Sequence, residues 1–246
     1  MKGQHTTSIK DLLFGNVNEL FIHYSKHMEM NQSASKEILI ELQYLAPIQY
    51  YSKLLLFDQV WIEQQEHYRK RSFRNRCNIG TAQGSLSLSI PLKKGKHEQM
   101  PIREVRVDND ASWQKIHWRS IRTAYGKAPF FEFYAGELIE FYQKKYEFLF
   151  DFSWDLQEFM LTTIGIDTRI QKTTEFCKQL PNKILDFRNK INPRDYLKSK
   201  DPNFVAYPYS QLFEDRQSFL PNLSILDMLF CTGPETYAYL DMSTPT

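Results

Sequence analysis

The stretch formed by residues 38–79 constrains the fold more than any other part of the chain. Its first apolar run, 38–45, alternates in the manner of a strand, and Pro47 ends it because proline donates no hydrogen bond to a central ladder. Apolar side chains then recur at helical spacing over 48–57, and Val60, Trp61 and Ile62 form a second short strand. A strand, a helix and a strand within about 25 residues predict a right-handed crossover between parallel neighbours. Ligands of such sheets bind beyond the carboxyl ends of the strands.

A basic run directly follows the second predicted strand. Five cations fall within the eight residues 69–76 (RKRSFRNR). As a strand, this run places Arg74 and Arg76 on one face, about 7 Å apart, where two guanidiniums fork onto a phosphate or paired carboxylates. With Lys70 beside them, they suit a nucleotide-sugar diphosphate, a coenzyme-A-like donor or an RNA backbone. The structural alternative is a solvated basic edge that prevents sheets from aggregating.

His67 is the histidine best placed for general-base chemistry, because it lies between the predicted strand end and the basic run. Glu66 or Tyr68 would orient it. The alternative is a loop histidine bonded to the backbone. No second metal-ligating side chain stands at ligand spacing, so the sequence predicts neither a metal nor a cofactor.

Four further side chains are candidates for substrate binding. Tyr44 and Tyr51 flank the strand end and are suited to stacking on a sugar or base, and Asn75 to hydrogen bonding with the sugar. His117 stands on the apolar face of a predicted helix. For both tyrosines and for His117 the alternative is ordinary core packing.

The remaining pattern predicts an α/β fold with a mixed sheet. A β-hairpin should join 73–79 to 85–92, and alternation predicts a strand at 102–108. A helix capped by Ser112 should place Trp113, Ile116 and His117 on its buried face. The other expected elements are one or two helices in 130–150, a helix at 154–164, a strand at 168–173 and, within an extended C-terminal return, a helix at 225–230 capped by Ser224.

Composition narrows the class of protein. The formal charge of +2 argues against a dedicated nucleic-acid binder. Three widely separated cysteines do not form a disulfide scaffold, and neither an apolar run of membrane length nor a signal peptide is present, so we expect a cytoplasmic protein. Nine glycines include no phosphate-cradling motif, so side chains must hold any anion.

The sequence divides into an extension at 1–35, loosely packed or outside the natural start, and a single domain at 36–246. Met30 is the alternative start, because it lies just before the polar linker 31–36 and the first strand.

A series of motifs along this domain resembles the WbqC-like protein family. They are YLAPIQYY at 44–51, EHYRK at 66–70, RNR at 74–76, Leu88 with Pro91, Trp113 with His117, Tyr125 with Ala128 and Pro129, and FLPNLSILD at 219–227. The resemblance covers about 40–240. Ala46 departs from it, since the family often has a second proline there.

The resemblance implies a bacterial transferase of O-antigen and lipopolysaccharide biosynthesis, which moves glycine or a related acyl group onto a sugar or sugar nucleotide. The partner would then be a small phosphorylated or nucleotide-sugar substrate. A nucleotidyl or phosphoryl transferase, or a non-catalytic module that binds RNA or a protein partner, remains as an alternative. The sequence does not specify the oligomeric state.

Overall fold

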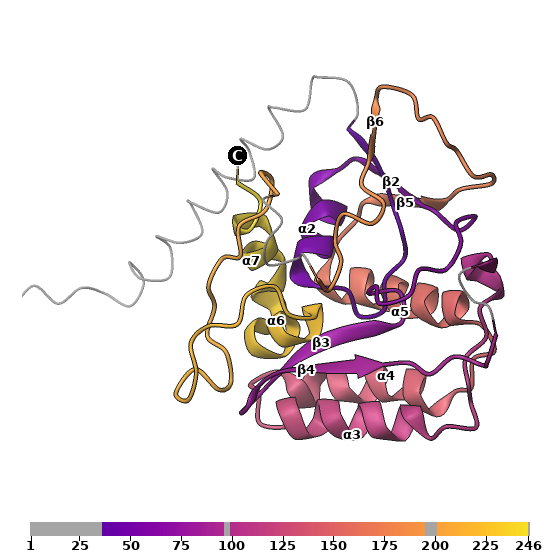
Figure 1. Cartoon of the computed structure of the whole chain (residues 1–246). Helices are drawn as coiled ribbons and strands as arrows, with labels where there is room; N and C mark the ends of the chain where they lie inside the picture. The colour runs from indigo at the N-terminus through magenta and orange to yellow at the C-terminus, as the bar shows by residue number, and fades with distance from the viewer. Residues whose placement is uncertain (1–35, 96–98, 195–200, 246) are drawn as a thin grey trace, which may run out of the picture. The chain divides into compact units, whose positions relative to one another are not determined.

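The computed structural model describes residues 36–95, 99–194 and 201–245 (Figure 1). The expected extension at 1–35, including Met30, lies outside the described residues. The described strands are β1 (Glu37–Ile40), β2 (Gln59–Ile62), β3 (Arg76–Thr81), β4 (Gly84–Ser89), β5 (Arg169–Lys172) and β6 (Ile184–Asp186). The helices are α2 (Ile48–Leu56), α3 (Trp113–Tyr125), α4 (Phe131–Gln143), α5 (Leu149–Ile164), α6 (Ile225–Thr232) and α7 (Thr236–Met242), with short 3-10 turns η2 (Ile102–Glu104) and η3 (Gly233–Glu235).

The strand–helix–strand opening is confirmed as a parallel unit. β1 pairs with β2 in parallel from Glu37 opposite Gln59 to Ile40 opposite Ile62, and α2 connects them. Pro47 stands at the N-cap of α2 in an extended conformation, which ends one element and begins the next. With β5 and β6 added in parallel at the two edges, the sheet has the order β5-β2-β1-β6.

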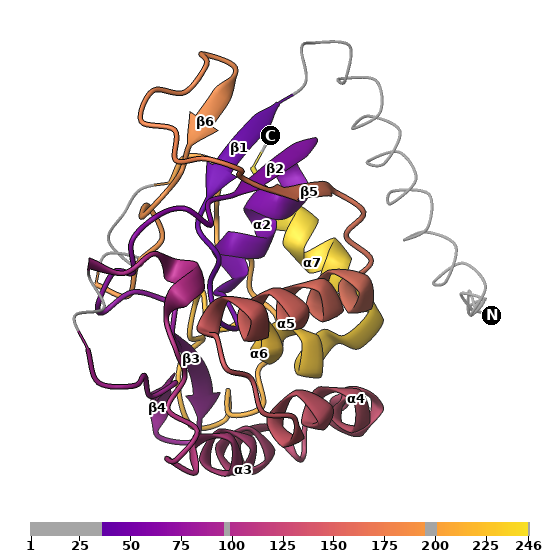
Figure 2. The ribbon, with the colours of Figure 1, turned by 90° about the vertical axis from the view of Figure 1, so that its right-hand side faces the viewer.

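The predicted hairpin forms a separate two-stranded sheet. β3 pairs with β4 antiparallel across a turn in which Gly84 has φ +104°, a conformation that favours glycine. The fold is therefore α/β as expected, with its parallel and antiparallel strands in two sheets. Figures 1 and 2 show α5 between the parallel sheet and the layer of α3 and α4, with the hairpin beside that layer.

The apolar faces of the middle helices fill the core between the two sheets. Trp113, His117 and Ile121 of α3 are buried, whereas Ile116, expected on that face, is 58% exposed. Ser112 makes no side-chain cap bond on α3, while Ser224 does accept from the backbone N–H of Leu226 in α6.

Three elements differ from the sequence prediction. The strand expected at 102–108 is wrong, because Pro101 opens the turn η2 instead, and only single bridges at Arg106 and Val107 follow. β6 was missed within a polar, proline-containing stretch. α7 was also missed, because Pro234 stands at the start of the turn η3 that leads into the helix, where its absent N–H costs nothing.

Within the described ranges, no helix is long and apolar enough to cross a bilayer. The same residues contain no group of three or more potential metal-ligating side chains close enough to share an ion.

Candidate functional site

The four parallel strands direct their carboxyl ends to one edge of the sheet, and the loops that follow build two adjacent hollows there. The first, about 570 Å³, is here called the basic hollow, because five cations and one carboxylate line it: Arg69, Lys70, Arg71, Arg74, Arg194 and Glu41. The second, about 480 Å³, is called the histidine hollow and includes His67. Both hollows share Arg69 and Asn189, so they lie side by side.

Arg74 forms the floor of the basic hollow through a buried bidentate pair with Glu66. Its Nε donates to Oε1 and its Nη2 to Oε2 of Glu66, both at 2.6 Å, and Nη2 also donates to Oδ1 of Asn189 at 2.9 Å. Arg74 is 2% exposed. Burial raises the pKa of Glu66, and the guanidinium opposes that rise. Burial alone would lower the pKa of Arg74, but Glu41 and Glu66 raise it on balance, so the guanidinium stays protonated.

Glu41, the first residue after β1, forms only a long ion pair with Arg74. Its Oε1 accepts from Gln43 Nε2 at 2.8 Å and its Oε2 from the backbone N–H of Asn189 at 2.7 Å. The nearest approach to Arg74, from Nη1 to Oε1, is 4.0 Å, beyond hydrogen-bond distance. Asn189 holds a left-handed backbone, φ +61°, and so contacts both floor groups from one position.

Arg188 closes the histidine hollow by tying β2 to β6. Its guanidinium is bidentate to Asp186, with Nε at 3.0 Å and Nη2 at 2.7 Å, and Nη1 donates to the fully buried Glu63 at 3.1 Å. It also lies over the ring of Phe176, 5.0 Å from the centroid. Asp186 and, more weakly, Glu63 raise the pKa of Arg188 further.

The sequence candidates divide between the site and the core. His67 is exposed in the histidine hollow and Lys70 is exposed in the basic hollow. Tyr68 lines the histidine hollow, and its hydroxyl donates to Oδ1 of Asn75 at 3.0 Å; Asn75 in turn donates to the carbonyl of Ile90 at 2.8 Å. Both ends of the Asn75 side-chain amide are therefore hydrogen-bonded, and they join the basic run to the end of the hairpin.

Two expectations about the arginines and Glu66 require correction. β3 begins at Arg76, so Arg74 lies in the preceding turn and the two arginines do not share a strand face. Arg76 is half-buried and does not line either hollow. Both oxygens of Glu66 accept from Arg74, so Glu66 positions that guanidinium instead of orienting His67.

The structure places Tyr44, Tyr51 and His117 in the core. The hydroxyl of Tyr44 bonds His117 Nδ1 at 2.9 Å and the hydroxyl of Tyr142 at 2.8 Å, while His117 Nε2 lies 3.2 Å from the carbonyl of Ser89. A carbonyl only accepts, so Nε2 carries the proton and Nδ1 accepts from Tyr44. Burial lowers the pKa of His117 to about 4, so the ring is neutral. Tyr51 is 1% exposed, and none of these three side chains lines a hollow described above.

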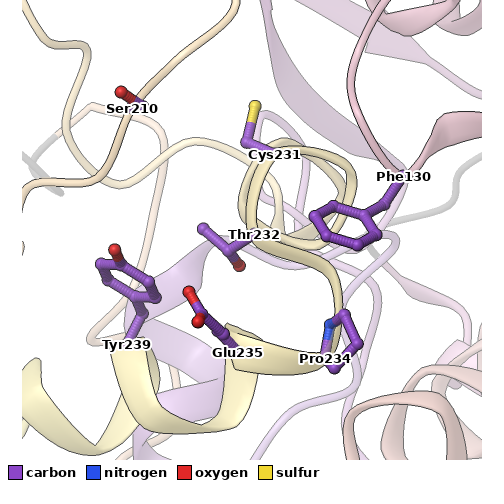
Figure 3. A pocket seen from close by; sticks show the side chains of 7 residues that line it. All are labelled: Phe130, Ser210, Cys231, Thr232, Pro234, Glu235 and Tyr239. Carbon is purple, nitrogen blue, oxygen red and sulfur yellow. The ribbon is translucent and has the colours of Figure 1, made fainter. Parts of the chain in front are cut away.

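A third hollow, of about 480 Å³, lies where α6 passes into α7 and is shown in Figure 3. Phe130, Ser210 and Tyr239 surround a single thiol, Cys231. Burial raises the pKa of Cys231 to about 12, so the thiol is protonated and a poor nucleophile near neutral pH. The edge of the parallel sheet is therefore the stronger candidate site.

Sequence reasoning missed several residues of this site, among them Glu41, Arg188, Asn189 and Arg194. Glu41 was recognisable, because it immediately follows the first predicted strand and the carboxyl-end rule applies to it directly. The others follow β6, and without that strand nothing in the sequence marked their loop.

Comparison with known proteins gives one family and one uncharacterised relative. The model of the WbqC-like protein family matches residues 43–205. A protein of Mycobacterium tuberculosis (strain H37Rv), described as "uncharacterized protein Rv1507c", is 25% identical over 228 residues, which cover 83% of this chain and 97% of the relative. No solved structure matches the chain.

Proposed function

This chain belongs to the WbqC-like protein family, and we propose that it is a transferase that moves an aminoacyl or related acyl group onto a sugar or sugar nucleotide in surface-polysaccharide biosynthesis. The observation that carries the proposal is the basic hollow, in which five cations meet one carboxylate at the carboxyl edge of a parallel sheet. Arg74 is paired with Glu66, so the exposed Arg69, Arg71 and Arg194 supply the positive charge that selects an anionic ligand.

The phosphates of the substrate bind in the basic hollow. Arg69, Arg71 and Arg194 are exposed at its rim and attract the anion from solvent, with Lys70 beside them. Arg74 contributes a fixed donor at the floor. Its Nε and Nη2 donate to Glu66 and Asn189, whereas its Nη1 makes the 4.0 Å ion pair with Glu41.

The reacting groups meet at the boundary of the two hollows. The hydroxyl or amine of the acceptor forms a bond to the acyl carbon, and the bond from that carbon to the donor's leaving group breaks. His67 takes the acceptor's proton and returns it to the leaving group. The cations of the rim stabilise the negative charge that develops on the acyl oxygen and the leaving group.

Binding of sugar nucleotides tests the first part of this proposal. UDP-N-acetylglucosamine should stabilise the protein in a thermal-shift assay, and the double variant R69A/R194A should bind it at least 10-fold more weakly. R119A removes another exposed arginine, from α3, and is the matched control, with unchanged binding expected. ATP, acetyl-CoA and tRNA complete the panel. Stabilisation by tRNA alone, or equal binding by R69A/R194A and wild type, would contradict the assignment.

Transfer activity tests the second part. With a donor and acceptor identified, H67Q should lower kcat about 10²–10⁴-fold, which is the usual contribution of a general base, and leave the binding of the sugar nucleotide unchanged. An H67Q variant with full kcat would remove the histidine from the mechanism.

A further inference from the structure

Glu41 is the one charged group of the basic hollow whose sign opposes all the others. It is 1% exposed and lines the floor, where burying a charge is costly unless an opposite charge meets it. Its two oxygens accept from neutral donors only, the amide of Gln43 and the backbone of Asn189. The nearest described cation, Arg74, remains 4.0 Å away at the closest pair of atoms.

The separation between Arg74 and Glu41 leaves one donor and one acceptor facing the hollow. Glu66 and Asn189 hold the Nε and Nη2 groups of Arg74, which prevents the guanidinium from turning toward Glu41. Asn189 holds Glu41 from the other side. A carboxylate oxygen accepts more than one hydrogen bond, so Glu41 retains acceptor capacity on both oxygens. The floor therefore presents a positive and a negative group, each fixed by a third residue.

We propose that the ligand of the basic hollow carries an ammonium group as well as its phosphate, and that Glu41 binds that ammonium while Arg74 and the rim cations bind the phosphate. This inference rests on the proposed function and specifies its substrate class: an amino sugar phosphate or another amine-bearing phosphorylated compound. Glu41 at 4.0 Å and Glu66 at 2.6 Å share the one guanidinium of Arg74, so a ligand with phosphate alone would leave the buried floor with one negative charge in excess. Glu41 acts here as a specificity-determining residue.

Two probes that differ at one position test the inference. Glucosamine 6-phosphate carries an ammonium where glucose 6-phosphate has a hydroxyl, and both fit the charge pattern of the rim. Calorimetric titration of the wild-type chain should give about 10-fold tighter binding of the amine, which corresponds to about 1.4 kcal/mol. In E41Q the ratio should fall to within about twofold, through weaker binding of the amine and undiminished binding of glucose 6-phosphate.

E37Q is the matched control. Glu37 is a buried glutamate at the other end of the same strand, β1, and it is bonded to Trp61 and Lys183 without lining either hollow. E37Q should keep the preference for the amine. If E41Q does not fold, the comparison of the two probes on the wild-type chain still decides the matter.

The outcomes separate the inference from the function on which it rests. Equal affinity of the wild type for both probes, or equal weakening of both in E41Q, overturns the role of Glu41 and leaves the anion site standing. If neither probe binds while UDP-N-acetylglucosamine does, the inference fails and the anion site stands; if none of the three binds, both fail.

Discussion

Replacing Arg74 by alanine is expected to destabilise the folded chain by about 4 kcal/mol at pH 8, because it leaves Glu66 buried and charged without its partner. The variant loses two charge-assisted bonds of 2.6 Å to Glu66 and one of 2.9 Å to Asn189, at a position that is 2% exposed. Removal of one member of a buried pair costs about 3–5 kcal/mol, against a total stability of about 5–15 kcal/mol for a typical domain.

The loss should shrink as the pH falls. Burial already raises the pKa of Glu66, and Arg74 is the group that opposes that rise, so R74A raises this pKa further. Between the unfolded and folded pKa values, folded R74A binds more protons than its unfolded chain, and its stability increases as the pH decreases. The deficit relative to wild type is therefore largest above the folded pKa of Glu66 and smaller at pH 5.

Urea unfolding followed by circular dichroism at pH 8 and pH 5 measures both effects. With a slope of about 2–3 kcal/mol per molar, a loss of 4 kcal/mol moves the midpoint by about 1.3–2 M. R69A, an exposed neighbour of the same residue type, should shift stability by less than about 0.5 kcal/mol. The double variant E66L/R74M should recover part of the loss, because it removes Glu66 together with its partner and leaves Glu41 as the one carboxylate that has lost its ion pair. A loss below about 1 kcal/mol, or one that is equal at both pH values, would refute the reasoning.

Three further outcomes follow from single features of the fold. The pKa of His117 is lowered to about 4 in the folded chain, so its contribution to stability is complete above about pH 6.5 and is lost as the pH falls toward 4. The loss amounts to about 3 kcal/mol. H117Q, measured by urea unfolding across that range, should lack this pH-dependent loss of stability. G80A should destabilise by about 1–3 kcal/mol in the same assay, because the new Cβ would lie 2.8 Å from Oδ1 of Asp227. Tyr125 donates to this oxygen, and Tyr209 and Gln211 donate to Oδ2, so the carboxylate is held in place; an unchanged midpoint would contradict the packing. R71G should keep or slightly raise the melting temperature, because Arg71 has φ +57°, a backbone conformation that glycine adopts more readily. The same variant should weaken binding of UDP-N-acetylglucosamine. A lower melting temperature would count against the backbone argument.

The location of the candidate site was predictable from the sequence, but the hydrogen bonds and ion pairs within it were not. The basic run after β2 pointed to the carboxyl edge of the sheet, and Arg69, Lys70, Arg71 and Arg74 do line a hollow there. The interpretation of Arg74 and Arg76 as a pair depended on extending β3 by two residues, an error of strand boundary that changed which side chains share a face. Tyr44 and Tyr51 fitted a binding site and the core equally well, because an aromatic residue beside a strand end has the same pattern in both.

The sequence by itself determined the parallel β1–α2–β2 unit, the hairpin and the helical middle, because hydrophobic period, Pro47 and the turn glycine act over a few residues. Only the tertiary structure decided that Arg74 is a floor group held by Glu66 and by Asn189, which lies 115 residues further along the chain. It also decided that β6 joins the sheet and brings Arg188, Asn189 and Arg194 to its edge. Such pairings depend on which strands lie next to each other, and local periodicity carries no record of that choice.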